Sequence, residues 1–161
     1  MDIKSSSEIR VTPDDMFEKF KSVLIKYNVN RKKAIDCANI FMNNSLDGVY
    51  SHGVNRFAAF IDFIERKVID VGAEPTLKAG FGAIEQWDGN VGPGPLNATI
   101  CCNRAMQIAD KSGIGCVALS NTNHWMRGGT YGWQAAKAGY IYIACTNTMR
   151  LMPAWGAIDC K

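Results

Sequence analysis

The sequence lacks the long apolar segments that carry proteins into or across membranes. Its longest purely apolar run, residues 140–145, is far shorter than the ~20 residues that a membrane-spanning helix needs. Residues 1–10 contain no apolar core of the kind found in secretory signals. The charge excess is small as well, with 18 Lys and Arg against 15 Asp and Glu, which argues against nucleic-acid binding. We therefore expect a soluble, cytoplasmic protein with no membrane and no nucleic acid among its partners.

Several common catalytic signatures are also missing. No G-x-G-x-x-G follows a candidate strand, and neither a Walker A lysine motif nor a G-x-S-x-G elbow occurs, which argues against a Rossmann dinucleotide loop, a P-loop enzyme and a serine hydrolase. None of the six cysteines are paired at C-x-x-C spacing, and we expect buried, reduced thiols. The two histidines lack clustered carboxylate or thiolate partners, so we predict no metal site.

What the chain does have is an ordinary globular composition, with 161 residues, 47% of them hydrophobic and 20% charged. In the first seventy residues apolar side chains recur every three or four positions, which predicts helices. Thr12 and Pro13 form a typical helix start, and Asn30 can cap a second helix that stops at Gly48. A third helix is expected over about 51–67.

The second half alternates between strand-like and helix-like segments, which favours an α/β layered fold. The expected strands are 76–79, 83–87, 115–120 (of the buried type) and 140–147, and the expected helices are 96–111 and 133–137. We divide the chain into a helical substrate-side unit at 1–71 and an α/β unit at 72–161. The second unit stops shortly after an apolar strand and looks truncated at its C-terminus.

The chemistry-bearing candidates surround the only two histidines. If the third helix begins near Ser51, then His52 and Arg56 are four residues apart and share one face near its N-terminus. The Arg56 guanidinium could bind a carboxylate through two parallel hydrogen bonds, and the imidazole could protonate an alkoxide formed beside it. The alternative is that both residues only decorate a helix surface, since such pairs are common.

His124 lies in a polar loop, residues 121–129, that follows a candidate strand and ends in two glycines. Loops at the ends of strands often carry ligand contacts in α/β folds. The alternative is an ordinary strand-to-helix connection whose histidine makes only local hydrogen bonds.

Three blocks together resemble the type-2 malate/L-lactate dehydrogenase family over about residues 10–160. They are DGVYSHGVNRF at 47–57, GAIEQWD at 82–88 and NHWMRGGTYGWQAA at 123–136. The S-H-G-x-x-R pattern is shared across that family, whereas the last block points to its branch acting on 2,3-diketo-L-gulonate.

The resemblance implies reduction of a 2-keto acid to a 2-hydroxy acid by a homodimer that uses NAD(P)H, with NADH expected over NADPH. It also implies a non-Rossmann NAD(P)-binding α/β domain, which would explain the missing glycine fingerprint. By resemblance, His52 is the proton donor, Arg56 binds the substrate carboxylate and His124 is a second catalytic histidine. Thr148, at the end of the last expected strand, matches a segment near the nicotinamide.

Family members continue for about as long again beyond the position of Lys161, so the resemblance covers their N-terminal half. Two other interpretations therefore stay open. The chain could be a non-catalytic remnant that acts through self-association or a partner chain. It could also bind carboxylates through Arg56 and His52 without transferring a hydride.

Overall fold

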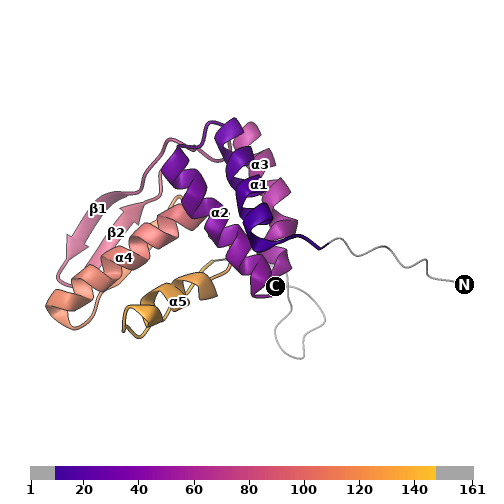
Figure 1. The fold of residues 1–161 in the computed structure, drawn as a ribbon. Helices are drawn as coiled ribbons and strands as arrows, with labels where there is room; N and C mark the ends of the chain where they lie inside the picture. Colours follow the sequence, from indigo (N-terminus) through magenta and orange to yellow (C-terminus); the bar gives the residue numbers. More distant parts are fainter. Residues whose placement is uncertain (1–9, 148–161) are drawn as a thin grey trace, which may run out of the picture.

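The computed structural model describes residues 10–147, which form a mixed α/β fold (Figure 1). The elements in chain order are α1 (Pro13–Lys26), α2 (Arg31–Leu46), the 3-10 turn η1 (Tyr50–His52), α3 (Val54–Glu65), β1 (Thr76–Phe81), β2 (Ile84–Asp88), α4 (Gly94–Ser112), β3 (Cys116–Ser120) and α5 (Gly129–Lys137). None of the helices within this described part is long and apolar enough to cross a membrane.

Two predicted helix starts are confirmed by their capping contacts. The Thr12 hydroxyl accepts a hydrogen bond from the backbone N–H of Asp15 at 3.1 Å, ahead of α1. The Asn30 side-chain oxygen accepts one from the N–H of Lys32 at 2.9 Å, ahead of α2. Each cap satisfies a backbone donor that has no partner inside its own helix.

An aromatic cluster holds the first three helices together. Phe20 of α1 stacks on Phe57 of α3 with ring centroids 4.2 Å apart, and Phe41 of α2 meets Phe57 edge-on at 5.1 Å. All three rings are buried, which confirms the predicted three-helix arrangement. Leu96 and Met126 from the second half of the chain are buried in the same core, so the helical unit depends on later residues for its packing.

The second half of the described chain contains a three-stranded sheet of order β1-β2-β3, together with α4 and α5. β1 and β2 form an antiparallel hairpin, whereas β2 and β3 run parallel and are connected through α4. Because β2 and β3 are parallel, their carboxyl ends, Asp88 and Ser120, lie side by side at one edge of the sheet. Loops that leave this edge are the usual ligand-contacting loops of α/β folds.

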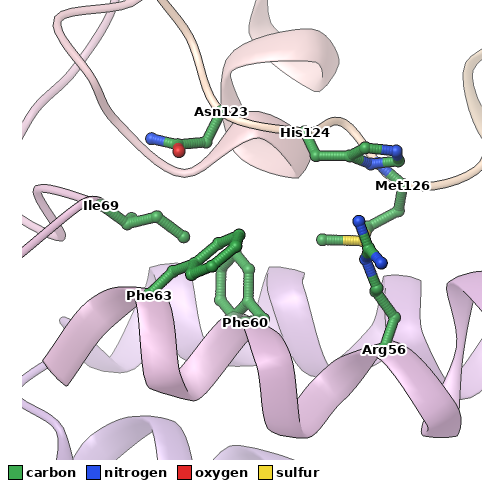
Figure 2. A pocket seen from close by; sticks show the side chains of 7 residues that line it. All are labelled: Arg56, Phe60, Phe63, Ile69, Asn123, His124 and Met126. Atoms are coloured by element: carbon green, nitrogen blue, oxygen red, sulfur yellow. The ribbon is translucent and has the colours of Figure 1, made fainter. Parts of the chain in front are cut away.

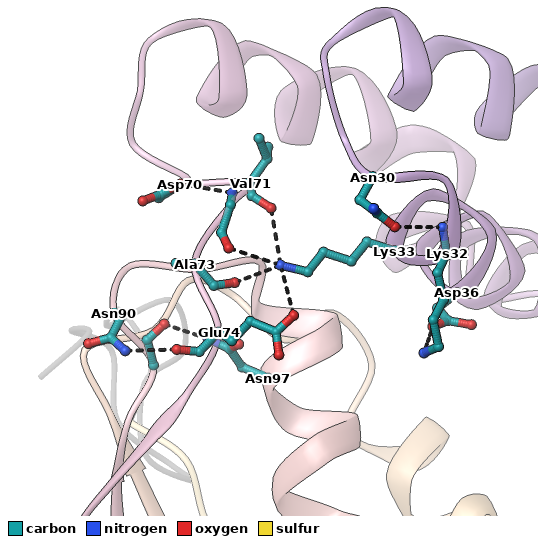
Figure 3. Close-up of polar contacts among 12 residues, drawn as sticks. Asn30, Lys32, Lys33, Asp36, Asp70, Val71, Ala73, Glu74, Asn90 and Asn97 are labelled. Carbon is teal, nitrogen blue, oxygen red and sulfur yellow. Dashed lines mark hydrogen bonds and ion pairs between the residues drawn. The ribbon is translucent and has the colours of Figure 1, made fainter.

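One lysine connects α2 to the segment that leads into β1 (Figure 3). The Lys33 ammonium donates hydrogen bonds to the carbonyl oxygens of Val71, Gly72 and Ala73, at 3.3, 3.2 and 2.9 Å. Its charge is balanced by Glu74, 3.3 Å away. This contact fixes the connection between the helices and the sheet.

Two strand predictions need correction. Residues 140–147 form no strand, and Ile141 and Ile143 are 95% and 88% exposed. The alternation there reflects Tyr140 and Tyr142 packing on one side against the small core around Tyr131, and a strand additionally needs a paired neighbour. β3 was expected to be fully buried, but alternate residues are exposed because α4 covers only one face of the sheet in the described chain.

The cysteine prediction holds for three of the described thiols. Cys37, Cys101 and Cys102 are buried and reduced, and burial raises the pKa of Cys37 to about 12. Cys116 and Cys145 are exposed instead, since they lie on the open side of β3 and in the unpaired segment 140–147. Cys160 lies outside the described residues.

Candidate active site

His52 lies on a turn rather than on a helix. The helix expected from Ser51 begins only at Val54, and η1 precedes it. Gly53 separates the two elements because it packs directly on α2, and a Cβ there would overlap the Ser45 hydroxyl. That hydroxyl accepts the N–H of Val54 at 2.9 Å and so caps α3. The predicted i,i+4 helical pair of His52 and Arg56 is therefore wrong, and Arg56 alone sits in the first turn of α3.

His124 is placed by the loop that leaves β3. The Asn123 amide donates to the carbonyl oxygens of Val68 and Val91 at 3.1 and 2.8 Å, which anchors the loop to two earlier connections. The backbone N–H of Met126 donates to Nδ1 of His124 at 2.9 Å. In neutral His124 the proton therefore resides on Nε2, which is left as a hydrogen-bond donor.

The fold brings the three predicted catalytic residues together although they come from different segments. The rings of His52 and His124 lie with centroids 5.6 Å apart and planes inclined at 35°. The Arg56 guanidinium points from α3 toward His124 and Met126 (Figure 2). The hollow beneath them, floored by Phe60 and others, has a volume of about 10 Å³. A hollow of this size has room for about one water molecule and is too small for a keto acid.

Positively charged neighbours surround His124 and affect its pKa. Partial burial lowers the pKa of His124, and the neighbouring Arg56 and His52 lower it further. The ring is therefore neutral at about pH 7, since its ordinary pKa of 6.5 already lies below that value. A neutral His124 and a cationic Arg56 provide hydrogen-bond donors for the oxygens of an anionic substrate.

Two contacts that the sequence did not reveal join the histidine-bearing segments. Asp47, just after α2, forms an ion pair with Arg127, three residues beyond His124. The buried Asn44 amide donates to the carbonyl oxygen of His52 at 3.0 Å and accepts the Thr130 hydroxyl at 2.9 Å. Asp47 and Arg127 lie 80 residues apart and Asn44 and Thr130 lie 86 apart, so no local pattern could have indicated these two contacts.

Two other candidate features remain. Thr148 lies outside the described residues. A larger hollow of about 490 Å³ opens between α2 and α4, but neither histidine lines it. Its polar residues include Lys33, whose ammonium is already engaged by the backbone carbonyls described above. We therefore place the candidate active site at the histidine pair and not at the larger hollow.

Comparison with known proteins identifies the family of this chain. The model of the malate/L-lactate dehydrogenase family matches residues 11–161, and the chain belongs to that family. Within the family it is similar to 2,3-diketo-L-gulonate reductase of Pasteurella multocida (50% identical) and of Mannheimia succiniciproducens (47% identical). Each match covers 95% of this chain and 46% of the relative, so the chain spans about half the length of these relatives.

Solved structures show the same fold. Malate dehydrogenase of Pyrococcus horikoshii superimposes with a TM-score of 0.79 at 30% identity, over 81% of this chain and 38% of that one. Sulfolactate dehydrogenase of Methanocaldococcus jannaschii gives 0.78 at 26% identity, again over 81% and 38%. The α/β class expected from the sequence is thereby confirmed.

The family implies a nicotinamide cofactor. The described residues are suited to binding the substrate and not to binding that cofactor. His52, Arg56 and His124 carry groups that could hydrogen-bond a carbonyl and a carboxylate. The loop from β2 into α4 contains Gly89, Gly92 and Gly94 but lacks the G-x-G-x-x-G pattern. Each of these glycines packs against neighbouring residues of this chain, and a Cβ at Gly94 would overlap the backbone of Asn123 and His124. We therefore assign no dinucleotide contact to the described residues.

Proposed function

We propose that this chain carries the substrate-binding and proton-donating part of an enzyme that reduces a 2-keto acid to a 2-hydroxy acid. The substrate we propose is 2,3-diketo-L-gulonate, reduced to 3-dehydro-L-gulonate, because the curated relatives cited above are named for that substrate. The observation that carries the proposal is the convergence of His52, His124 and Arg56 from two separate segments.

Each of the three side chains has a distinct task in this proposal. Arg56 binds the substrate carboxylate, for which its planar guanidinium is suited. Neutral His124 donates a hydrogen bond from Nε2 to the carbonyl oxygen and so polarises it. His52 then protonates that oxygen as it becomes an alkoxide. The hydride itself is the contribution of NADH, which we propose in preference to NADPH, and Thr148 is proposed to lie near the nicotinamide.

We also propose that the protein works as a cytoplasmic homodimer. Leu46, Tyr50 and Val54 support the dimer, because these apolar side chains are 56%, 57% and 39% exposed at the junction of α2, η1 and α3. They border His52, so a partner subunit seated on them would cover one side of the site and exclude water from it. Analytical ultracentrifugation of the chain tests this association directly.

The decisive experiment measures binding and turnover on the purified chain. Calorimetry would follow the binding of 2,3-diketo-L-gulonate and of NADH, and loss of NADH absorbance would follow reduction. Arg56→Met should weaken keto-acid binding by roughly 2–5 kcal/mol, as expected for a lost buried charge contact. Arg66→Met is the matched control, since Arg66 lies at the end of α3 in an exposed pair with Asp62, and it should bind as the wild type does.

The turnover rate distinguishes the proposed role of His52 from substrate binding. His52→Gln should lower turnover by roughly 10²–10⁴ with little change in keto-acid binding, because only the proton transfer is lost. Equal binding by wild type and Arg56→Met would contradict the carboxylate assignment. Keto-acid binding without any NADH oxidation would instead favour the carboxylate-binding alternative for this chain.

A further inference from the structure

Asn44 is an unusual residue to find at the centre of this fold. It is only 1% exposed, near the C-terminal end of α2. A buried amide must find partners for both its donor and its acceptor atoms, because an unpartnered polar group costs about 1–3 kcal/mol. Asn44 finds them in the carbonyl of His52, 3.0 Å away, and the hydroxyl of Thr130, 2.9 Å away.

These two partners belong to the two halves of the site. One is the backbone of the first histidine itself. The other lies in the first turn of α5, directly after the loop that holds the second histidine. The Asp47–Arg127 ion pair joins the same two segments on the surface. The segments 44–52 and 124–130 are thus held together once in the interior and once outside.

We infer that Asn44 is a positioning residue, which sets the spacing of the His52 and His124 rings through its two amide hydrogen bonds. The spacing matters for catalysis only if the proposed function holds, but the geometric part can be measured without it. The side chain must donate to a carbonyl and accept from a hydroxyl at once. An amide of this length does both, whereas a carboxylate only accepts and an aliphatic side chain does neither.

The chain offers a simple probe of this spacing because it contains only two histidines. Their ring signals can be followed by NMR across a pH titration and assigned with His52→Gln and His124→Gln. Arg56 and His52 are the charges that lower the pKa of His124, and Arg127, on the same loop as His124, is paired with Asp47. Replacing His52 by Gln in the wild type should therefore raise the pKa of His124 by a measurable amount, which reports the coupling between the rings.

The test compares that coupling among variants of Thr130. Thr130→Val keeps the shape but removes the hydroxyl, so the rise in the His124 pKa on replacing His52 should become measurably smaller as the rings separate. Thr130→Ser keeps the hydroxyl and should restore the full rise. Thr99→Val is the matched control, because it removes a comparable half-buried hydroxyl bond, to Pro95 within α4, and should leave the coupling unchanged.

Asn44→Asp provides a second route to the same answer, since it replaces the donor facing the His52 carbonyl with an acceptor. It should reduce the coupling as Thr130→Val does. An undiminished coupling in Thr130→Val, or no coupling in the wild type, would overturn the inference. Keto-acid binding is measured separately on the wild-type chain, so failure of the proposed function would appear there and not in the histidine titrations.

Discussion

The contact between the sheet and α4 gives a stability prediction whose size follows from the structure. Glu85 of β2 is 8% exposed and faces α4. Arg104 donates to both of its carboxylate oxygens, Nε to Oε2 at 2.8 Å and Nη2 to Oε1 at 2.5 Å. The Arg104 guanidinium lowers the pKa of Glu85 to about 2, burial opposes that change, and the Trp87 indole N–H adds to it.

The pKa change sets the size of the effect. A drop from 4.5 to about 2 corresponds to about 3 kcal/mol of stabilisation, since each factor of ten in the acid constant is worth about 1.4 kcal/mol. The Arg104 side chain is 35% exposed, so solvent screening reduces this to about 1–2 kcal/mol. We expect Arg104→Met to lose that amount in urea unfolding at about pH 7. Arg66→Met, which breaks an exposed pair on α3, should lose less than about 0.5 kcal/mol.

The pH dependence distinguishes the ionic contribution from packing. Because the pKa of Glu85 is lower in the folded chain, the stabilisation is complete above about pH 4.5 and is lost as the pH falls toward 2. The difference between wild type and Arg104→Met should therefore fall to under about half of its neutral value by pH 3. A difference that stays constant from pH 7 to pH 3 would refute this reasoning and assign the effect to the aliphatic part of Arg104.

Two further predictions concern thiols and backbone packing. In the native chain a disulfide reagent should modify the exposed Cys116 and Cys145 rapidly. Cys37 is buried and its pKa is raised to about 12, so it should react only after unfolding. Rapid modification of all three thiols would contradict the packing of α2. Gly53→Ala should destabilise the chain by about 1–3 kcal/mol in thermal or urea unfolding, because its Cβ would overlap the Ser45 hydroxyl. An unchanged stability would show that the backbone at the η1–α3 junction can shift to make room for the methyl group.

The sequence predicted those parts of the fold that local chemistry determines. Thr12 and Asn30 cap their helices as expected because capping needs only the neighbouring residues. The start of α3 was misplaced because the obstacle at Gly53 is Ser45, a contact that no helical periodicity reveals. The strand expected over 140–147 failed for a similar reason, since pairing depends on a neighbouring strand and not on alternation alone.

The sequence suggested the members of the candidate site but not their geometry. His52, Arg56 and His124 were identified by their neighbours and by the family resemblance, whereas their convergence depends on contacts across the fold. Asn44 carried no signal, since a lone asparagine in a helix has no pattern to distinguish it. The division of the chain at residue 71 stays a prediction, and Leu96 and Met126 pack into the helical core from beyond it.

The two histidines differ in what surrounds Nδ1, and this difference supports their separate roles. Nδ1 of His124 accepts the backbone N–H of Met126, so a proton on that nitrogen would break the bond. Nδ1 of His52 lies 2.9 Å from the Ser51 hydroxyl, which can donate to the neutral ring or accept from the charged one. Gaining or losing a proton therefore leaves His52 with its partner, while the nearby Arg56 and His52 further disfavour a charged His124. A proton donor must pass between both states in each cycle, which favours the proposed role of His52 and the proposed role of His124 as a neutral ring that polarises the carbonyl.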